Sequence, residues 1–355
     1  MARQSIILRA GIVAAASAFC ATALSMGASA QSAPMGASAQ SVEEFYKGRT
    51  ITAYIAGTPG GLFDIATRAM ADHLGKFIPG HPKIQAQNMP GGGGLVLANH
   101  LYNVAPKDGT AIAYVGPIAI DPLLNPGGNA KFDATKFTWI GSLGAQHSVL
   151  SLWASAPAKT AEDLRRIETI VAGTGAAATT DIYPKVLNAV LGTKFKLVTG
   201  YQGSKETYLA MERGEAHGRF NSWDALKSTV PDWIRDKKVN IVLQATLSRH
   251  PELPDAPTVL DLAQTDEQRQ AMRFLFLPAQ SGRPIAAPPG LPPDRAKALR
   301  DGFAKLVADP AFLADMRKRG VEVEMPMTGD EVAKTYAAVY DTPKAIVDLV
   351  AAAMK

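Results

Sequence analysis

The side chains that most often carry catalysis are few in this sequence and are not grouped. Its histidines lie at six positions: His73, His81, His100, His147, His217 and His250. No two of them stand four residues apart, the spacing that places two metal ligands on one helix face, and Cys20 is the single cysteine. Neither a G-x-S-x-G nucleophile motif nor a G-x-x-x-x-G-K-[ST] phosphate loop occurs. We therefore predict no catalytic residue, no metal ion and no cofactor.

One glycine pattern has the form of a nucleotide-binding motif. Residues 173–178 read G-T-G-A-A-A between a predicted strand and a predicted helix, which matches G-x-G-x-x-A. The acidic residue that would hold the ribose is absent near position 193, where the motif requires it. A nucleotide-dependent periplasmic oxidoreductase that uses this loop is the alternative to a function in binding alone.

A second glycine loop has the character of an anion cradle. Residues 58–64 read T-P-G-G-L-F-D and come directly before a predicted helix. Gly60 and Gly61 allow the backbone to turn tightly, so that its N–H groups can approach a ligand. A helix N-terminus has unpaired N–H donors and a partial positive charge, and it can hold a carboxylate without a cationic side chain. Phe63 and Asp64 complete this candidate site, where Asp64 either caps the helix or accepts a hydrogen bond from the ligand.

The loop at 173–180 offers the same cradle a second time. Gly175 brings the backbone close, and Thr179 and Thr180 add hydroxyl donors at the start of the next helix. Further polar groups follow predicted strands at Tyr201–Gly203, which includes Gln202, and at Asn221. Two such loops facing one another would hold a small anion between them.

Hydrophobic periodicity predicts the elements that carry these loops. Thr50–Gly57 is a β-branched, apolar run typical of a buried strand, and apolar residues then recur every three or four positions from Ala66 to Phe77, as on a helix face. The alternation continues with strands predicted at 83–87, 111–115, 149–153, 169–172, 196–199, 218–221 and 240–244, and with helices at 95–104, 182–191 and 205–213. Thr160 and Asp163 resemble a capping box and predict a further helix start. This pattern indicates an α/β fold with mixed sheets covered by helices.

The last third of the chain is predicted to be mainly helical. Apolar residues share a face over 299–307 and again over 312–316, and a helix is expected over 330–354. The run at 274–277 is the one strand candidate there. A lone strand must join a sheet formed elsewhere, so we expect the chain to return to its first domain.

The N-terminal sequence predicts export from the cytoplasm, and the composition argues against nucleic-acid binding. The 355 residues are 47% hydrophobic and carry 37 Lys and Arg against 32 Asp and Glu, without a basic run. Arg3 and Arg9 precede an Ala-rich apolar stretch, which predicts a signal peptide over residues 1–30 and periplasmic export. Cleavage is expected after Ala30 or, because the sequence M-G-A-S-A-Q-S is repeated, after Ala39, and it would remove Cys20.

Several ordered motifs resemble one family, the extracytoplasmic solute receptors of tripartite tricarboxylate transporters, also called Bug or TctC proteins. The motifs are Tyr46–Ile51, Pro59–Gly61 with Asp64, Asn88–Gly94, Pro106–Thr110, Tyr201–Gly203, Arg249–Val259 and Leu306–Pro310. Each is weak alone, but their order and spacing along nearly the whole mature chain make the resemblance specific.

The resemblance implies a two-lobed periplasmic-binding-protein fold of the Venus flytrap, type II-like class. Lobe 1 would comprise residues 42–146 and 250–355, lobe 2 residues 147–249, and residues 31–41 would form a flexible segment. Carried over to this sequence, the ligand-binding residues are Gly60, Gly61, Phe63, Asp64, Gly175, Thr179, Thr180, Tyr201, Gln202, Gly203 and Asn221. The implied partners are a small organic acid and one large and one small membrane subunit of the transporter. We expect a monomer that binds no nucleic acid and is not an enzyme; a sensor subunit that binds the same acids is a further alternative.

Two departures from the family pattern bear on the ligand. Many relatives have Lys at the position of Gln202 and His at the position of Asp181. Both differences make the cleft less positive. We therefore expect a ligand less anionic than a tricarboxylate, such as a monocarboxylate, an aromatic acid or an acid bearing an amine.

Overall fold

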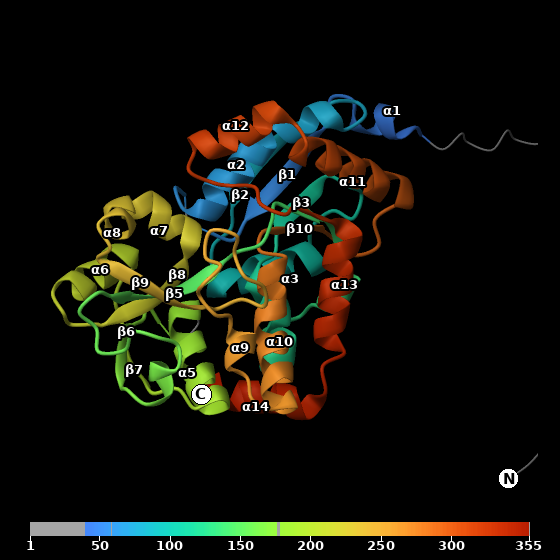
Figure 1. The fold of residues 1–355 in the computed structure, drawn as a ribbon. Coiled ribbons are helices and arrows are strands. Elements are labelled where there is room, and N and C mark those ends of the chain that lie inside the picture. The colour runs from blue at the N-terminus through green and yellow to red at the C-terminus, as the bar shows by residue number, and fades with distance from the viewer. Residues whose placement is uncertain (1–39, 58, 176–177, 355) are drawn as a thin grey trace, which may run out of the picture. The chain divides into compact units, whose positions relative to one another are not determined.

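Two mixed β-sheets, each packed against helices, organise the molecule (Figure 1). The computed structural model describes residues 40–57, 59–175 and 178–354, and the chain from Gln40 onward forms one compact unit. The predicted signal peptide, both predicted cleavage points and residues 31–39 of the predicted flexible segment lie outside the described residues. Within the described part, no helix combines the length and the apolar character needed to cross a bilayer.

The first sheet has the strand order β11-β4-β10-β3-β1-β2. Its strands are β1 Thr50–Ile55, β2 Lys83–Asn88, β3 Ala111–Tyr114, β4 Thr138–Ser142, β10 Pro284–Ala287 and β11 Met327–Thr328. Strands β2, β1 and β3 run parallel, while β10 runs antiparallel to both β3 and β4. The chain therefore does return to its first sheet after building the second, as the sequence predicted.

The second sheet has the strand order β7-β6-β8-β5-β9. Its strands are β5 Ser148–Trp153, β6 Thr169–Ala172, β7 Phe195–Val198, β8 Gly218–Ser222 and β9 Val239–Gln244. Strand β6 is parallel to β7 and to β8, whereas β5 is antiparallel to β8 and β9. We call the part of the molecule around the first sheet the first lobe and the part around the second sheet the second lobe.

Helices connect and cover these strands. The α-helices are α1 Val42–Tyr46, α2 Leu62–Leu74, α3 Leu95–Asn103, α4 Asp121–Leu124, α5 Thr179–Leu191, α6 Ser204–Glu212, α7 Trp223–Thr229, α8 Pro231–Arg235, α9 Val259–Leu262, α10 Asp266–Gln280, α11 Pro293–Val307, α12 Pro310–Lys318, α13 Gly329–Tyr340 and α14 Lys344–Met354. Short 3-10 turns are η1 Gly75–Phe77, η2 Gly92–Gly94, η3 Pro117–Ile120, η4 Ala134–Lys136 and η5 Asp163–Arg165. Except for 274–277, every strand predicted from periodicity is present within a residue or two.

One predicted strand is wrong. Residues 274–277 lie inside α10, and β10 follows instead at Pro284–Ala287. A capping box starts α10, in which Thr265 Oγ1 accepts the N–H of Gln268 at 3.2 Å and the Gln268 side chain reaches back to the N–H of Thr265. A short apolar run fits a buried helix as well as a strand, and the capping box is the local signal that favours the helix.

Two helix predictions need smaller corrections. The helix expected over 330–354 is divided into α13 and α14 around Pro343, whose ring cannot continue a helix. Thr160 and Asp163 do exchange the two bonds of a capping box, but only the short turn η5 follows them.

The core of the second lobe is completed by late parts of the chain. Helix α14 packs on α5, and α10 packs on both. Tyr183 of α5 meets Phe276 of α10 with ring centroids 4.7 Å apart, and Lys185 donates from Nζ to the carbonyl of Met354 at 3.2 Å. The lobe boundaries expected from the sequence, 42–146 with 250–355 and 147–249, stay a prediction.

Candidate functional site

The first glycine loop lies at the point where the connections of the parallel strands diverge. Strand β1 is flanked by β2 and β3; α2 leads from β1 to β2, and α3 leads from β2 to β3 on the far side. In open α/β sheets, ligands bind in the crevice beyond the carboxyl ends of the two strands where this reversal occurs. Here that crevice lies between the ends of β1 and β3, where the loop of Gly60 and Gly61 leads into α2.

The Asp64 carboxylate holds this loop in shape. It accepts the N–H of Gly60 at 2.9 Å, and it also accepts from Arg68 Nε and from Asn88 Nδ2, each at 2.9 Å. The hydrogen bond from Arg68 is the main reason why the pKa of Asp64 is lowered to about 2. Asp64 is 4% exposed and is occupied by these three donors. Asp64 thus joins the loop to α2 and β2 rather than capping the helix, whose N-cap Gly61 makes no side-chain hydrogen bond.

The donors left for a ligand are the first amides of α2. Gly61 is the N-cap, with ordinary extended backbone angles and no side chain to cap the helix. The N–H groups of the first turn, including those of Phe63 and Asp64, have no carbonyl of their own helix to bond. Gly60 contributes shape rather than a donor, because its N–H already points to Asp64 and its φ is +81°.

The side chain of Phe63 connects this loop to the end of β3. Its ring stacks on Tyr114 with centroids 4.3 Å apart and an interplanar angle of 22°. Tyr114 donates from its hydroxyl to the carbonyl of Gly282 at 3.2 Å. Both aromatic side chains are thus held at the carboxyl edge of the sheet.

The second glycine loop occupies the equivalent place in the second sheet. Strand β6 is flanked by β7 and β8; α5 leads from β6 to β7, and α6 leads from β7 to β8. Residues 173–178 leave β6 and enter α5, although residues 176 and 177 lie outside the described part. The two lobes therefore share a topology. The strand order β2-β1-β3 in the first corresponds to β7-β6-β8 in the second, and a glycine loop follows the middle strand of each.

Asp181 does for this loop what Asp64 does for the first. It is the third residue of α5, as Asp64 is of α2, and it accepts the N–H of Gly175 at 3.0 Å. It also accepts from Thr180 Oγ1 at 3.2 Å and from Thr199 Oγ1. No cationic side chain pairs with Asp181 among the described residues. The second cradle is therefore more negative than the first.

This network explains the G-T-G sequence without a nucleotide. A Cβ at Gly173 would lie 2.2 Å from Asp181 Oδ1, so glycine makes room for the carboxylate. Gly175 has a φ of +137°, which side-chain-bearing residues rarely adopt. In a dinucleotide site such glycines admit a pyrophosphate, whereas here an anionic side chain fills that space. The loop argues against the oxidoreductase alternative.

The two threonines at the start of α5 differ in whether their hydroxyls are exposed to solvent. Thr180 is 6% exposed, and its Oγ1 accepts the N–H of Thr174 at 3.0 Å, so it belongs to the framework of the loop. Thr179 is exposed at the first position of the helix. Thr179 is the hydroxyl that remains accessible to a solute.

The other predicted residues lie at the ends of β7 and β8. Tyr201 donates its N–H to the carbonyl of Gly173 at 3.3 Å, which joins the two loops. Gln202 is exposed, Gly203 is the N-cap of α6, and Asn221 is 8% exposed near the end of β8. Asn221 Oδ1 accepts from Ser151 Oγ at 2.8 Å, and its Nδ2 donates to the carbonyl of Ser222 at 3.4 Å. The second N–H of this amide is the group left for a ligand.

Sequence reasoning missed the side chains that fix these loops. Asn88 is the last residue of β2 and Thr199 directly follows β7, so the rule that ligand sites form at strand carboxyl ends would have found them. Arg283 lies next to β10, a strand that periodicity did not predict, and the sequence carried no signal for it.

Two histidines and a carboxylate that are far apart in the sequence converge between the lobes. Candidate ligand atoms of His147, His250 and Glu324 lie within 4.8 Å of one another, a cluster that the spacing argument did not foresee. His250 Nδ1 accepts the N–H of Glu252 at 3.1 Å, so the neutral ring carries its proton on Nε2, which contacts Glu324 Oε2 at 3.0 Å. That nitrogen then has no lone pair to give a metal. Burial lowers the pKa of His147 and keeps that ring neutral near pH 7.

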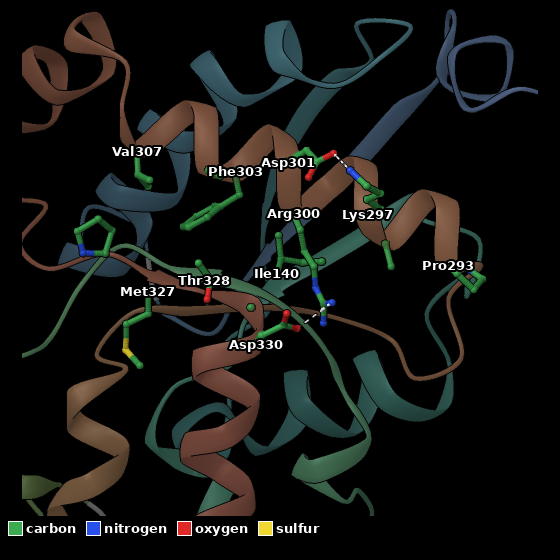
Figure 2. Close-up of a pocket in the computed structure, with 14 residues that line it drawn as sticks. Ile140, Pro293, Lys297, Arg300, Asp301, Phe303, Val307, Met327, Thr328 and Asp330 are labelled. Atoms are coloured by element: carbon green, nitrogen blue, oxygen red, sulfur yellow. Dashed lines mark hydrogen bonds and ion pairs between the residues drawn. The ribbon is translucent and has the colours of Figure 1, made fainter.

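A separate cavity of about 500 Å³ lies in the first lobe. Figure 2 shows it between α11 and the segment that leads through β11 into α13, with Phe303 and Ile140 among its lining residues. Its charged side chains are paired, as in the contact between Arg300 Nη1 and Asp330 Oδ1 at 3.1 Å. None of the predicted site residues lines this cavity.

Several solved structures share this architecture over most of the chain. A TctC solute-binding protein from Polaromonas, crystallised without ligand, has a TM-score of 0.66 at 18% identity, covering 85% of this chain and 99% of its own. MatC from Rhodopseudomonas palustris, with bound malate, has a TM-score of 0.58 at 19% identity over 85% and 99%. Another R. palustris protein, solved with adipate, has a TM-score of 0.59 at 17% identity over 85% and 97%.

These likenesses define the class of the fold. The chain has the two-lobed α/β fold of periplasmic binding proteins, with one mixed sheet in each lobe. Within that class, the Polaromonas structure is a TctC solute-binding protein, the type that the sequence motifs resemble. A scan against models of protein families finds no match, and neither does a comparison with curated proteins.

Proposed function

We propose that this protein is a periplasmic receptor that captures a small organic carboxylate between its two lobes. The observation that carries the proposal is the duplicated site: Gly60 with Asp64 and Gly175 with Asp181 shape two loops at equivalent points of two sheets. Each loop presents the unpaired amides of a thirteen-residue helix, α2 or α5. Binding requires neither a metal nor a cofactor.

Closure of the lobes around the acid is the proposed mechanism. The α2 amides hold the carboxylate from the first lobe, while Thr179, Tyr201, Gln202, Gly203 and Asn221 complete the site from the second. More hydrogen bonds form when both loops contact the acid, so ligand shifts the population toward the closed arrangement. Phe63, stacked on Tyr114, supplies an apolar wall for the carbon skeleton.

Membership of the TctC family and delivery to a transporter are parts of the same proposal. The ordered motifs and the shared fold support it, and they imply one large and one small membrane subunit as partners. The signal-like N-terminus supports a periplasmic location. We propose that the receptor is a monomer with the lobe boundaries given above.

The charges at the site favour an acid of low charge. The eleven predicted site residues include one charged side chain, Asp64, and Arg68 already neutralises it. Asp181 adds an anion to the second half of the site without a paired cation. The negative charge of the buried Asp181 would therefore repel a second carboxylate on the ligand, whereas an amine, a hydroxyl or an aromatic ring would be accepted.

A thermal-shift panel tests the proposal. The panel contains monocarboxylates, aromatic acids, amino acids, malate, adipate and citrate, and mass spectrometry identifies any acid that co-purifies. We expect a monocarboxylate or amino acid to raise the melting temperature most. Stabilisation by citrate above every monocarboxylate and amino acid would contradict the charge argument. Stabilisation by a nicotinamide or flavin cofactor, with no response to any acid, would favour the oxidoreductase.

A further inference from the structure

Arg283 lies at the same sheet edge as the first glycine loop, although it is remote in the sequence. It directly precedes β10, and Ile285 pairs with Tyr114 of β3 in antiparallel register. Strand β10 runs antiparallel to β3, so β10 begins at the edge of the sheet where β3 ends. Strand β1 is parallel to β3 and ends at the same edge. Arg283 is 2% exposed and is anchored there, with its N–H donating to the carbonyl of Gly144 at 3.3 Å.

Its guanidinium contacts groups of both lobes. Nη2 donates to Asp224 Oδ2 at 3.3 Å, while Nη1 donates to the carbonyl of Glu322 at 3.2 Å. Asp224 is in the first turn of α7, the helix that follows β8, and it stands three residues after Asn221. One buried side chain therefore joins the end of β8 to the start of β10.

A continuous set of contacts connects this ion pair to the first half of the site. Phe63 stacks on Tyr114, Tyr114 donates to the carbonyl of Gly282, and Gly282 is bonded to Arg283. Gly282 packs closely against Gly144, since a Cβ there would lie 2.1 Å from the carbonyl oxygen of Gly144. These contacts connect Asp224 of α7, through Arg283 and Gly282, to Phe63 beside the first glycine loop.

Arg283 uses only one of the two N–H groups that could bind the Asp224 carboxylate side by side. Nε and Nη2 form one edge of the guanidinium, the edge that can grip a carboxylate with two parallel bonds. In this structure Nη2 has its bond, but Nε is buried and has no partner among the described residues. A buried donor without an acceptor is unfavourable, and an acceptor brought to Nε would remove that cost.

We propose that Arg283 and Asp224 form a latch between the lobes, which gains its second hydrogen bond when the lobes close on a ligand. The inference rests on the proposed function for the identity of that ligand. Both are positioning residues: neither needs to touch the acid. Their pairing favours the arrangement in which Asn221 and the first glycine loop meet the same molecule.

The test measures the distance between the lobes directly. Spin labels are placed on exposed residues of α12 and α6 through Lys318→Cys and Glu212→Cys, in the full chain carrying Cys20→Ser so that no other thiol reacts. Distance distributions are compared for this background alone and with Asp224→Asn, Arg283→Lys or the control Asp301→Asn. Asp301 forms an exposed ion pair with Lys297 on α11, away from the latch.

Without ligand, we expect broader and longer distributions for Asp224→Asn and Arg283→Lys, and an unchanged one for Asp301→Asn. Circular dichroism and denaturant midpoints verify that each variant is folded. Arg283→Lys keeps the charge but cannot make two parallel bonds, so it should retain part of the wild-type behaviour. Distributions of both latch variants that match the control would overturn the latch, whether or not an acid binds.

Malate, adipate and benzoate are then added at millimolar concentration. An acid that shortens the distance in the background and in Asp301→Asn, with about tenfold weaker affinity in the latch variants, supports both proposals. Equal shortening and equal affinity in all variants would refute the latch and leave the receptor function standing. A widened ligand-free distribution with no response to any acid would support the latch and count against the carboxylate receptor.

Discussion

Gly60 donates its N–H to the Asp64 carboxylate at 2.9 Å, a bond that ties the glycine loop to the first turn of α2. Gly175 and Asp181 repeat this relationship in the second lobe at 3.0 Å. In both places an acidic side chain at the third position of a helix holds the preceding glycine loop. The loops are thus preorganised, and the ligand does not have to order them.

Acid sensitivity follows from the lowered pKa of Asp64. Because this pKa falls from 3.8 to about 2 on folding, the carboxylate contributes stability above about pH 4 that is lost as the pH falls through 2. We expect Asp64→Asn to cost on the order of 2 kcal/mol at pH 7, and we expect the difference from wild type to vanish near pH 2. Urea denaturation of both proteins between pH 7 and pH 2 measures this difference in unfolding free energy. Asp301→Asn, which breaks an exposed pair, should change stability by less than about 1 kcal/mol, and an equal loss in both variants would contradict the assignment.

A matched pair of glycines separates backbone strain from loss of the site. Gly60 and Gly127 have φ values of +81° and +80°, both are exposed, and an added Cβ would meet no atom within 4 Å at either position. Gly60→Ala and Gly127→Ala should therefore each destabilise the protein by about 1 kcal/mol. Only Gly60→Ala should weaken acid binding, by about tenfold or more, as measured by calorimetry. Equal affinities of the two variants would remove Gly60 from the site.

Substitution of the two adjacent threonines of α5 should affect different properties, ligand affinity for one and stability for the other. Thr179→Ala removes an exposed hydroxyl, so we expect about fivefold weaker acid binding with little change in the unfolding free energy. Thr180→Ala removes the acceptor of the Thr174 N–H and should lower that free energy by about 1 kcal/mol. Calorimetry and urea denaturation on both variants check the pair. A stability loss confined to Thr179→Ala would reverse the roles assigned to them.

Charge at position 202 should tune specificity. Gln202→Lys places a cation at an exposed position beside the second loop, and we expect it to favour malate and adipate over benzoate by about fivefold at low ionic strength. The gain should shrink in 0.5 M salt, because an exposed charge is screened. Gln85→Lys, on an exposed face of β2, makes the same charge change as a control. Identical preferences in the two variants would show that residue 202 does not face the acid.

Local sequence patterns predicted most of the fold. The alternating strands and helices and both glycine loops were found because their signals lie within short stretches of chain. Residues 274–277 were misassigned since a four-residue apolar run fits a helix or a strand equally well, and β10 was missed because P-I-A-A has little strand character.

The site was predicted only in part, for a related reason. Its residue types follow strand ends and could be recognised, but their partners could not. Asp181 was noticed as a change of charge, whereas its hydrogen bond to Gly175 depends on the folded loop. The pairing of Arg283 with Asp224 joins residues 59 positions apart, which no local pattern reports.

The packing of α14 on α5 has a consequence for the order in which the molecule forms. Helix α14 is the last described element to leave the ribosome, while the face of α5 that it covers is made more than 150 residues earlier. The apolar face of α5 therefore stays exposed to solvent during translation, and during any passage across a membrane, until α14 packs on it. An export chaperone would find its binding surface on α5 for as long as the C-terminal helix is missing.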